Sequence, residues 1–224
     1  MTRTAIIAAF AGELKHIVGG WKHERRNGVD TWSHRDDNLY VAACAGAGQD
    51  AATSAFATVE ESAPIDLVFS VGWAGALTAD LTSGTAHNVA GVIDARTGER
   101  FRCDAGAGDL WLVTAPRVAN HADKVRLAST YAAALVDMEA AAIARLAHMR
   151  SIPFYCIKGI SDGLTDKLPD FNRFLSSTGQ LQLSRLVLFA LFRHAYWSAL
   201  IQMGDNSKKA SQRIAESLHD FLDE

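Results

Sequence analysis

The fold of this chain is decided by two stretches, VDMEAAAIA at residues 136–144 and KGISD at residues 158–162. The first places a carboxylate, Glu139, in the opening turn of an alanine-rich helix. The second places another, Asp162, just past an apolar run that is typical of a buried strand. Ligands of open α/β sheets bind where strands end and helices begin, so we expect both acids to face one small molecule.

Strand-like and helix-like patterns alternate over about three quarters of the chain, which predicts an α/β domain with a largely parallel or mixed sheet covered on both faces. Short apolar runs predict the strands, and longer runs with helical spacing predict the helices. Turn-forming residues at Asp36–Asn38 and Arg96–Glu99 predict two hairpins. The predicted strands lie at 5–10, 29–34, 39–44, 66–71, 110–114 and 153–160, and the main helices at 49–62, 122–130 and 138–149.

Residues 1–224 are predicted to form a single domain with a helical C-terminal segment from about Phe171. A polar break at Gly204–Ser207 predicts that Ser207 caps a final helix. The charged run Lys22–Arg26 is typical of a solvated turn. Gly46–Gly48 favours a tight turn before a helix over a dinucleotide site, because the third glycine of that fingerprint is absent.

The composition excludes several classes of protein. A formal net charge of -3 lacks the basic excess of a nucleic-acid-binding protein, so no nucleic-acid partner is expected. The three cysteines are widely spaced in apolar surroundings, which suits buried thiols in a reducing compartment. The eight histidines lack the spacing of metal ligands, and the first residues lack a cleavage site. We expect a cytoplasmic protein without a metal.

The acidic residues suit one reaction, the cleavage of the bond between a sugar and a purine base. That reaction needs a proton for the departing base, stabilisation of a cationic sugar, and a nucleophile held opposite the base. Asp162 is the candidate acid, Glu139 can accept hydrogen bonds from two ribose hydroxyls, and Glu13 is placed beyond the first strand to activate water. Each of these acids, taken alone, is also typical of a turn or a helix start.

Four motifs resemble those of the nucleoside phosphorylase superfamily, in the same order: IIAAFAGE at 6–13, GWAGAL at 72–77, VDMEA at 136–140 and GISD at 159–162. The resemblance covers about residues 4–176 and is nearest to the nucleosidase branch, which includes the methylthioadenosine/S-adenosylhomocysteine nucleosidases. It implies a three-layer α/β/α fold with a central mixed twisted sheet. It also implies that Glu13 activates water, Met138 and Glu139 contact the ribose, Asp162 protonates the base and Phe171 covers the nucleoside.

Two residues depart from the pattern of that superfamily. Trp73 stands where a serine usually touches the nucleophile or phosphate, and its bulk favours water over phosphate. Lys158 stands where an arginine often lies near the nucleophile, so it joins Glu13 and Asp162 as a catalytic candidate. The predicted substrate-binding residues are Phe10, Gly72, Trp73, Met138, Glu139, Ser161 and Phe171.

A narrower resemblance links residues 124–128, 136–139 and 206–210 to the hopanoid-associated branch, which acts on an adenosyl-hopanoid lipid. The apolar residues 186–192 would suit a lipid tail or a membrane surface, but they are too few to span a bilayer. The same residues are also typical of a core or a subunit interface.

The sequence therefore predicts an enzyme that hydrolyses the N-glycosidic bond of a purine nucleoside, of adenosine type and modified at the 5′ position, without a cofactor. Three alternatives stay open: a phosphate-dependent purine nucleoside phosphorylase, a non-catalytic nucleoside-binding protein, and an adenosyl-hopanoid nucleosidase that is peripheral to the membrane. A homo-oligomer is expected, with a dimer favoured.

Overall fold

The computed structural model describes residues 2–34, 39–104, 108–166, 168–182, 185–186, 188–189, 193 and 196–223. The turn predicted at Asp36–Asn38 lies outside these residues. In chain order the elements are β1 Thr4–Ala8, α1 Ala11–Leu14, β2 Lys22–Arg26, β3 Val29–Ser33, β4 Tyr40–Cys44, α2 Gln49–Ser62, β5 Leu67–Ala76, β6 Ala86–Asp94, β7 Arg100–Arg102, β8 Leu110–Thr114, α3 His121–Tyr131, β9 Leu135–Asp137, α4 Ala140–Arg150, β10 Phe154–Asp162, the 3₁₀ helix η1 Phe171–Phe174, and α6 Trp197–Asp223.

The sheet is mixed, as predicted, and part of it closes on itself. Its strand order is β10-β6-β8-β9-β5-β1-β4-β3-β2, and β10 also pairs with β5, so five strands form a closed ring. Strands β1, β4, β5 and β10 run parallel to one another, and so do β6, β8 and β9. The two sets meet in antiparallel pairs at β10–β6 and β5–β9.

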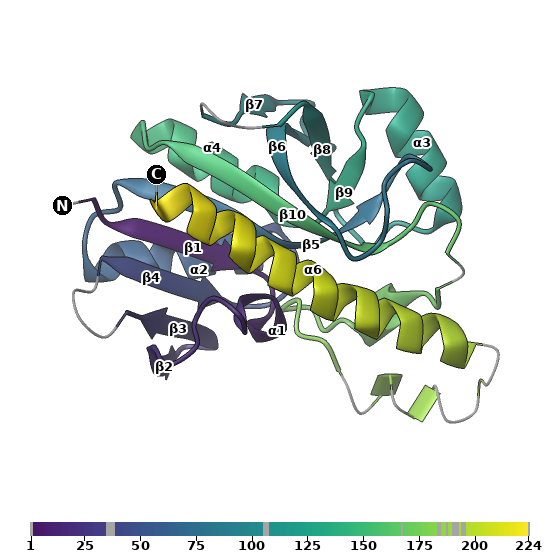
Figure 1. Cartoon of the computed structure of the whole chain (residues 1–224), viewed down its shortest axis with the longest axis horizontal. Coiled ribbons are helices and arrows are strands. Elements are labelled where there is room, and N and C mark those ends of the chain that lie inside the picture. Colours follow the sequence, from purple (N-terminus) through teal and green to yellow (C-terminus); the bar gives the residue numbers. More distant parts are fainter. Residues whose placement is uncertain are drawn as a thin grey trace.

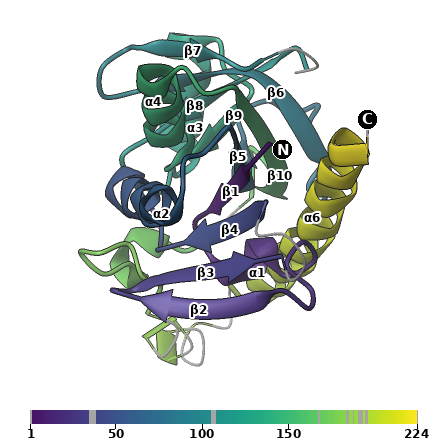
Figure 2. The ribbon, with the colours of Figure 1, turned by 90° about the vertical axis from the view of Figure 1, so that its left-hand side faces the viewer.

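Helices cover both faces of the sheet, which confirms the predicted three layers (Figures 1 and 2). On one side α2 and α4 bury Phe56, Val59 and Ile143 in the larger core cluster. On the other side α1 and α6 bury Leu14 and Ile214 in a second cluster. Full burial of such a side chain contributes roughly 1.5–3 kcal/mol, so the two clusters account for much of the stability of the layers.

Local sequence sets the ends of the helices beside the site. Gly48 precedes α2 with φ +100°, a left-handed conformation that favours glycine, and α2 ends before Pro64 with Ala63 extended. Asp137 fixes the start of α4, because its carboxylate accepts a hydrogen bond of 2.9 Å from the Ala140 backbone N–H. The left-handed Gly48 directly before α2 confirms the turn predicted at Gly46–Gly48.

Several sequence predictions are wrong. Lys22–Arg26 is not a turn but the exposed edge strand β2, which pairs with β3. Strand β9 and the first part of β6 were not predicted, whereas the hairpin predicted at Arg96–Glu99 is confirmed by the antiparallel pair of β6 and β7. The register of β6 shifts next to Gly91, where a side chain would lie 2.7 Å from the Phe101 carbonyl oxygen.

The C-terminal segment also differs from its prediction. It is not continuously helical from Phe171, because η1 is followed by a bridge between Leu175 and Leu181. Residues 204–207 do not break the last helix but lie inside α6, and Ser207 is buried there rather than capping a helix start. The buried face of α6 and its packing on the sheet outweigh the weak helix propensity of these four residues.

Gly159 of β10 sets the distance between the sheet and α6. A Cβ atom at Gly159 would lie 2.7 Å from the Ala210 Cβ and 3.0 Å from the Ile214 Cδ1. We therefore expect Gly159→Ala to lower the free energy of unfolding by roughly 1–3 kcal/mol, as overpacking does. The matched control is Gly204→Ala, which has nothing within 4 Å and should raise stability by up to about 1 kcal/mol. Urea unfolding of both variants measures this; equal stability of the two would contradict the packing described.

Candidate active site

Glu13 is a buried acid whose carboxylate is held entirely by backbone groups. It lies in the short helix α1, directly after β1, and is 3% exposed. Its Oε2 accepts hydrogen bonds of 2.8 Å from the N–H groups of Ala9 and Phe10, and its Oε1 accepts one of 2.7 Å from Trp73. These three donors fix the position and the orientation of the carboxylate.

Gly72 makes room for this carboxylate. It has φ +142°, and a Cβ atom there would lie 2.6 Å from the Glu13 Oε1. Both the backbone conformation and the close contact require glycine at this position. Gly72, predicted to bind substrate, thus contacts the acid itself.

Glu139 is the second buried acid, and it joins two loops of the site. Its Oε1 accepts a hydrogen bond of 2.7 Å from Gly48 N–H, before α2, and its Oε2 accepts one of 3.1 Å from Met138 N–H. The carboxylate therefore links the start of α4 to the start of α2. This contact joins residues 91 positions apart in the chain.

Lys158 lies beneath these two acids and is 1% exposed. Its Nζ lies 2.9 Å from the Asp137 Oδ2 and donates a hydrogen bond of 3.3 Å to the Ser70 hydroxyl. The other oxygen of Asp137 accepts a hydrogen bond of 2.7 Å from the Thr114 hydroxyl. A buried ion pair of this kind is stable only where further hydrogen bonds satisfy its atoms, as they do here. The predicted contact between Lys158 and a nucleophile stays a prediction.

Burial controls the charges of this group. It raises the pKa of Glu13 above its ordinary value, against the three backbone hydrogen bonds and the charge of Lys158, which lower it. Burial, assisted by Asp137, raises the pKa of Glu139 to about 8. Burial alone would lower the pKa of Lys158, but Asp137 and neighbouring groups outweigh it and raise the pKa. The positive charge of the buried Lys158 thus favours the ionised forms of both Glu13 and Glu139.

Asp162 ends β10 and lies further along the same strand. Its Oδ2 forms an ion pair with the Lys124 Nζ, and its Oδ1 accepts a hydrogen bond of 2.6 Å from the Ser161 hydroxyl. Sequence reasoning assigned Lys124 no part in the site. A signal was present, because Lys124 falls on the same face of the predicted helix 122–130 as Leu127, and a lysine on a buried face needs a partner.

The predicted aromatic residues lie on two sides of these acids. The Trp73 ring packs against Gly12 and α6, and its Nε1 donates to the Ser211 hydroxyl at 2.9 Å and to the Ser207 carbonyl at 3.1 Å. Phe10 lies 6.5 Å from Trp73, measured between ring centroids. Phe171 begins η1. That these aromatic rings contact a substrate stays a prediction.

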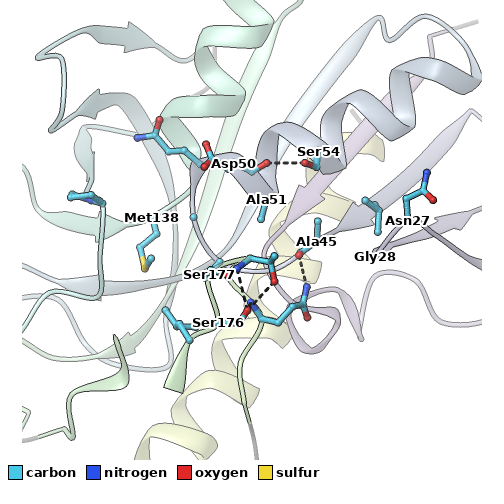
Figure 3. A pocket seen from close by; sticks show the side chains of 18 of the residues that line it. Asn27, Gly28, Ala45, Asp50, Ala51, Ser54, Met138, Ser176 and Ser177 are labelled. Atoms are coloured by element: carbon cyan, nitrogen blue, oxygen red, sulfur yellow. Dashed lines mark hydrogen bonds between the residues drawn. The ribbon is translucent and has the colours of Figure 1, made fainter. Parts of the chain in front are cut away.

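A cavity of about 780 Å³ opens beside Met138 and the loop before α2 (Figure 3). Of the predicted site residues, Met138 lines it, whereas Glu13, Glu139 and Asp162 do not. Glu139 is nevertheless adjacent, because its hydrogen-bond partner Gly48 forms part of the wall. The cavity walls combine polar and apolar surface, and their polar side chains are those of Arg25, Asn27, Gln49, Asp50, Ser54, Arg96, Asn172, Ser176, Ser177, Thr178 and Gln180.

The segment 175–181 forms one wall of this cavity by packing on the loop 46–48. The Ala47 N–H donates a hydrogen bond of 2.8 Å to the Gly179 carbonyl oxygen. A Cβ atom on Gly46, which has φ +119°, would lie 2.9 Å from the Gly179 backbone. The glycine at 46 therefore permits the close approach of two backbone segments that are distant in the sequence.

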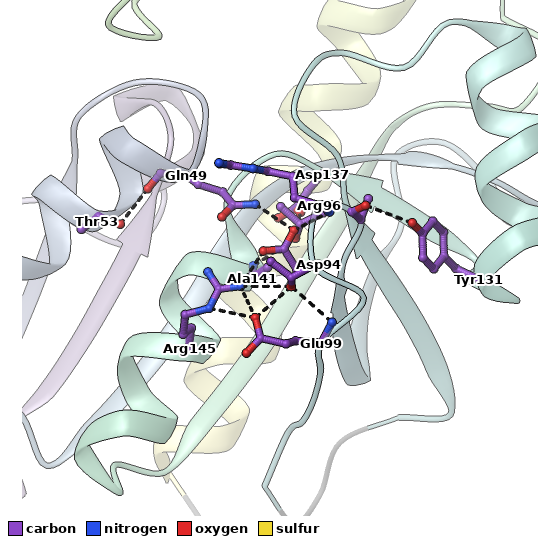
Figure 4. A network of polar contacts seen from close by, with 12 residues as sticks. Gln49, Thr53, Asp94, Arg96, Glu99, Tyr131, Asp137, Ala141 and Arg145 are labelled. Carbon is purple, nitrogen blue, oxygen red and sulfur yellow. Dashed lines mark hydrogen bonds and ion pairs between the residues drawn. The ribbon is translucent and has the colours of Figure 1, made fainter.

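A polar network that sequence reasoning also missed supports the start of α2 (Figure 4). Arg145 of α4 pairs with Asp94 at 2.6 Å and with Glu99 at 2.7 Å. Asp94 also accepts a hydrogen bond of 3.3 Å from the Gln49 amide. The network ties α4, the β6–β7 hairpin and the first residue of α2 together, so it positions Gly48, which contacts Glu139.

The structure thus brings Glu13, Glu139 and Lys158 together and places Asp162 four residues after Lys158 on β10. Among the described residues, no group of three or more His, Cys, Asp or Glu side chains is placed to hold a metal ion.

Comparison with known proteins identifies the class of this fold. Residues 96–188 match a sequence-family model described as Phosphorylase superfamily. The match includes the motifs at 136–140 and 159–162 and confirms their resemblance to that superfamily. Solved structures that align with the whole chain share its fold. No curated protein sequence matches the chain.

Several solved structures share the fold. The 5′-methylthioadenosine/S-adenosylhomocysteine nucleosidase of Helicobacter pylori aligns with a TM-score of 0.74 and 14% identity, over 100% of this chain and 98% of that one. The futalosine hydrolase of the same species aligns with a TM-score of 0.74 and 14% identity, over 99% of this chain and 97% of that one. The 5′-methylthioadenosine nucleosidase of Arabidopsis thaliana aligns with a TM-score of 0.75 and 14% identity, over 100% of this chain and 95% of that one. At these identities the alignments establish the fold.

The raised pKa of Glu139 predicts how stability depends on pH. Its ordinary value is 4.5 and its value in the folded protein is about 8, so between these pH values the folded state holds a proton that the unfolded state lacks. The contribution of Glu139 to the free energy of unfolding is therefore largest below pH 4.5, decreases as pH rises, and is constant above about pH 8. The fall attributable to Glu139 is at most about 1.4 kcal/mol per pH unit.

Glu139→Gln should remove this dependence, since the amide does not titrate. We expect the free energy of unfolding of wild type, relative to this variant, to decrease from pH 5 to pH 8. Urea unfolding at each pH measures it, with the exposed Glu216→Gln as a matched control. A wild-type-to-variant difference that is constant with pH would show that Glu139 is not protonated in the folded state.

Proposed function

We propose that this protein is an enzyme that hydrolyses the N-glycosidic bond of a purine nucleoside and releases the base. The observation that carries the proposal is that Glu13 and Glu139 lie around one buried lysine, with Asp162 at the end of the same strand. The motifs that hold these acids resemble those of the nucleosidase branch. Nucleosidases and a hydrolase are among the proteins that share the fold.

Glu13 has the properties of a general base for water. A carboxylate offers about four lone-pair sites, and three are taken by the N–H groups of Ala9, Phe10 and Trp73, which leaves one for a water molecule. Burial raises the pKa of Glu13 and so increases its basicity near neutral pH. Glu13 then takes a proton from water as the water attacks the sugar.

Glu139 and Met138 would hold the ribose. In its ionised form, the Glu139 carboxylate accepts hydrogen bonds from the two ribose hydroxyls and stabilises the positive charge that develops on the ring. Asp162 delivers a proton to the departing base. Ser161 orients Asp162 through its hydrogen bond to Oδ1.

Water is the preferred nucleophile because the site is rich in buried acids. Phosphate would approach Glu13 and Glu139, and the charge of Lys158 is already balanced by Asp137 at 2.9 Å. In the ionised forms that the proposed reaction requires, these acids disfavour an anionic nucleophile at close range. The phosphorylase and the non-catalytic binding protein remain the alternatives that the experiment below distinguishes.

The finer features of the substrate are also proposals. We propose an adenosine-type base and a modified 5′ position, with the cavity beside Met138 available to the 5′ group. A homo-oligomer, with a dimer favoured, and a cytoplasmic location remain predictions.

The lipid-linked alternative has one observation in its favour. Leu188, Trp197 and Ile201 are large apolar side chains that are 57%, 44% and 66% exposed. In the part of the chain that the structure describes, no helix is long and apolar enough to cross a membrane. An adenosyl-hopanoid substrate would therefore be met at the membrane surface.

The direct test measures base release from adenosine and 5′-modified adenosines in reactions with and without phosphate. Chromatography identifies the products. We expect free base and free sugar in phosphate-free buffer. Asp162→Asn and Glu13→Gln should each lower kcat by about 10²–10⁴-fold, because a positioned acid or base contributes that much. The exposed Asp205→Asn is the control and should retain full activity.

Three results would contradict the proposal. Strict dependence on phosphate with a sugar phosphate product would indicate a phosphorylase. Saturable binding without base release over hours would indicate a binding protein. Normal turnover by Asp162→Asn would show that the acid is a different residue.

A further inference from the structure

Lys124 is a buried lysine that contacts the candidate acid. It lies in α3, is 4% exposed, and donates a hydrogen bond of 2.6 Å to the Gly163 carbonyl oxygen as well as pairing with Asp162. Its whole side chain is therefore removed from water, and its ammonium has one ionised partner.

The surrounding structure makes room for this pair. A Cβ atom on Gly75 of β5 would lie 3.1 Å from the Lys124 Cε and 3.2 Å from the Asp162 Oδ2. Glycine at this position thus lets both side chains meet over the strand. Buried ion pairs are weak sources of stability, and apolar side chains of similar volume often replace them without loss. Stability alone does not account for a lysine here.

The pair places a proton donor beside the candidate acid. A general acid must carry a proton when the base departs, yet a carboxylate in an ion pair with an ammonium carries none. The Lys124 ammonium, whose Nζ pairs with the Asp162 Oδ2, is placed to supply that proton.

We propose that Lys124 stores the proton that Asp162 passes to the departing base. The inference rests on the proposed function, and it makes Lys124 a positioning residue that acts through Asp162 rather than by touching the substrate. Neither the sequence motifs nor the family resemblance assigned this residue a role.

The proton balance of the step is complete. The N-glycosidic bond breaks and its electron pair goes to the base, which takes a proton from Asp162. Asp162 takes that proton from the Lys124 Nζ, which becomes a neutral amine. The attacking water gives its proton to Glu13, which then releases it to solvent, and solvent returns a proton to Lys124, so the full cycle consumes one water and no net proton.

Other titratable groups near the pair are engaged elsewhere. Asp166 accepts a hydrogen bond of 2.8 Å from the Gly163 N–H, and the His121 Nδ1 lies 2.9 Å from the Leu164 carbonyl oxygen. Asp123 of α3 pairs with Arg117 and Arg126 at its exposed side. Lys124 is the cation that the structure places against Asp162.

Two substitutions separate proton storage from simple orientation. Lys124→Arg keeps the positive charge beside Asp162, but a guanidinium does not release its proton near neutral pH. Lys124→Met removes both the charge and the proton. We expect kcat at neutral pH to fall by about 10²-fold or more in both variants, with little change in KM. The exposed Lys208→Met is the control and should match wild type.

The pH profile adds a readout that a structural role would not move. In Lys124→Met, Asp162 can take a proton from water, so kcat should recover as pH is lowered, whereas Lys124→Arg should not recover. Wild-type kcat in Lys124→Arg together with a loss in Lys124→Met would show that Lys124 only orients Asp162. Unchanged kcat and pH profiles in both variants would exclude any role.

An infrared measurement makes the inference independent of turnover. The difference spectrum between wild type and Asp162→Asn should show an ionised carboxylate, because Asp162 is paired with an ammonium. The same difference in the Lys124→Met background should show a protonated carboxyl group as pH falls. Identical spectra in both backgrounds would overturn the inference. If wild type releases base from no purine nucleoside, the proposed function fails, and the infrared comparison alone decides whether Lys124 controls the Asp162 proton.

Discussion

The buried ion pair between Lys158 and Asp137 is the interaction on which the rest of the site depends. It joins β10 to β9, two strands of the five-membered ring that do not pair with each other, with 2.9 Å between the Nζ and the Oδ2. Asp137 also fixes the start of α4 and accepts the Thr114 hydroxyl, so one carboxylate organises three elements. Removing either partner would leave an uncompensated buried charge, which is far more costly than losing an exposed pair.

The charge of Lys158 makes it feasible to bury two more acids. Glu13 and Glu139 have raised pKa values because burial disfavours their ionised forms, and Lys158 opposes that effect on both. Backbone N–H groups complete their hydrogen bonding, so neither acid depends on a mobile side chain. The result is a rigid pair of carboxylates whose pKa values lie above the ordinary value, which favours proton transfer at a pH closer to neutral. Lys124 provides Asp162 with a separate cation.

The sequence predicted the fold class and most of the elements, because those follow from local patterns and short motifs. It also singled out Glu13 and Glu139, which the structure buries near Lys158. It missed β9 and the first part of β6, and it predicted a helix from Phe171 where residues 175–181 turn back onto Gly46. It also missed Lys124 and the Arg145–Asp94 network. These features depend on contacts between residues far apart in the chain, and periodicity carries no information about such contacts. The cavity beside Met138 likewise arises from segments that meet only in three dimensions.

The central claim is that Glu13, Glu139 and Asp162 surround one nucleoside. The most direct measurement is a crystal structure of the protein with a non-hydrolysable adenosine analogue. The account predicts ribose hydroxyls within hydrogen-bond distance of Glu139, a water between Glu13 and the sugar, and a base nitrogen facing Asp162. An analogue bound in the cavity beside Met138 with none of these three carboxylates within reach of its sugar or base would contradict it.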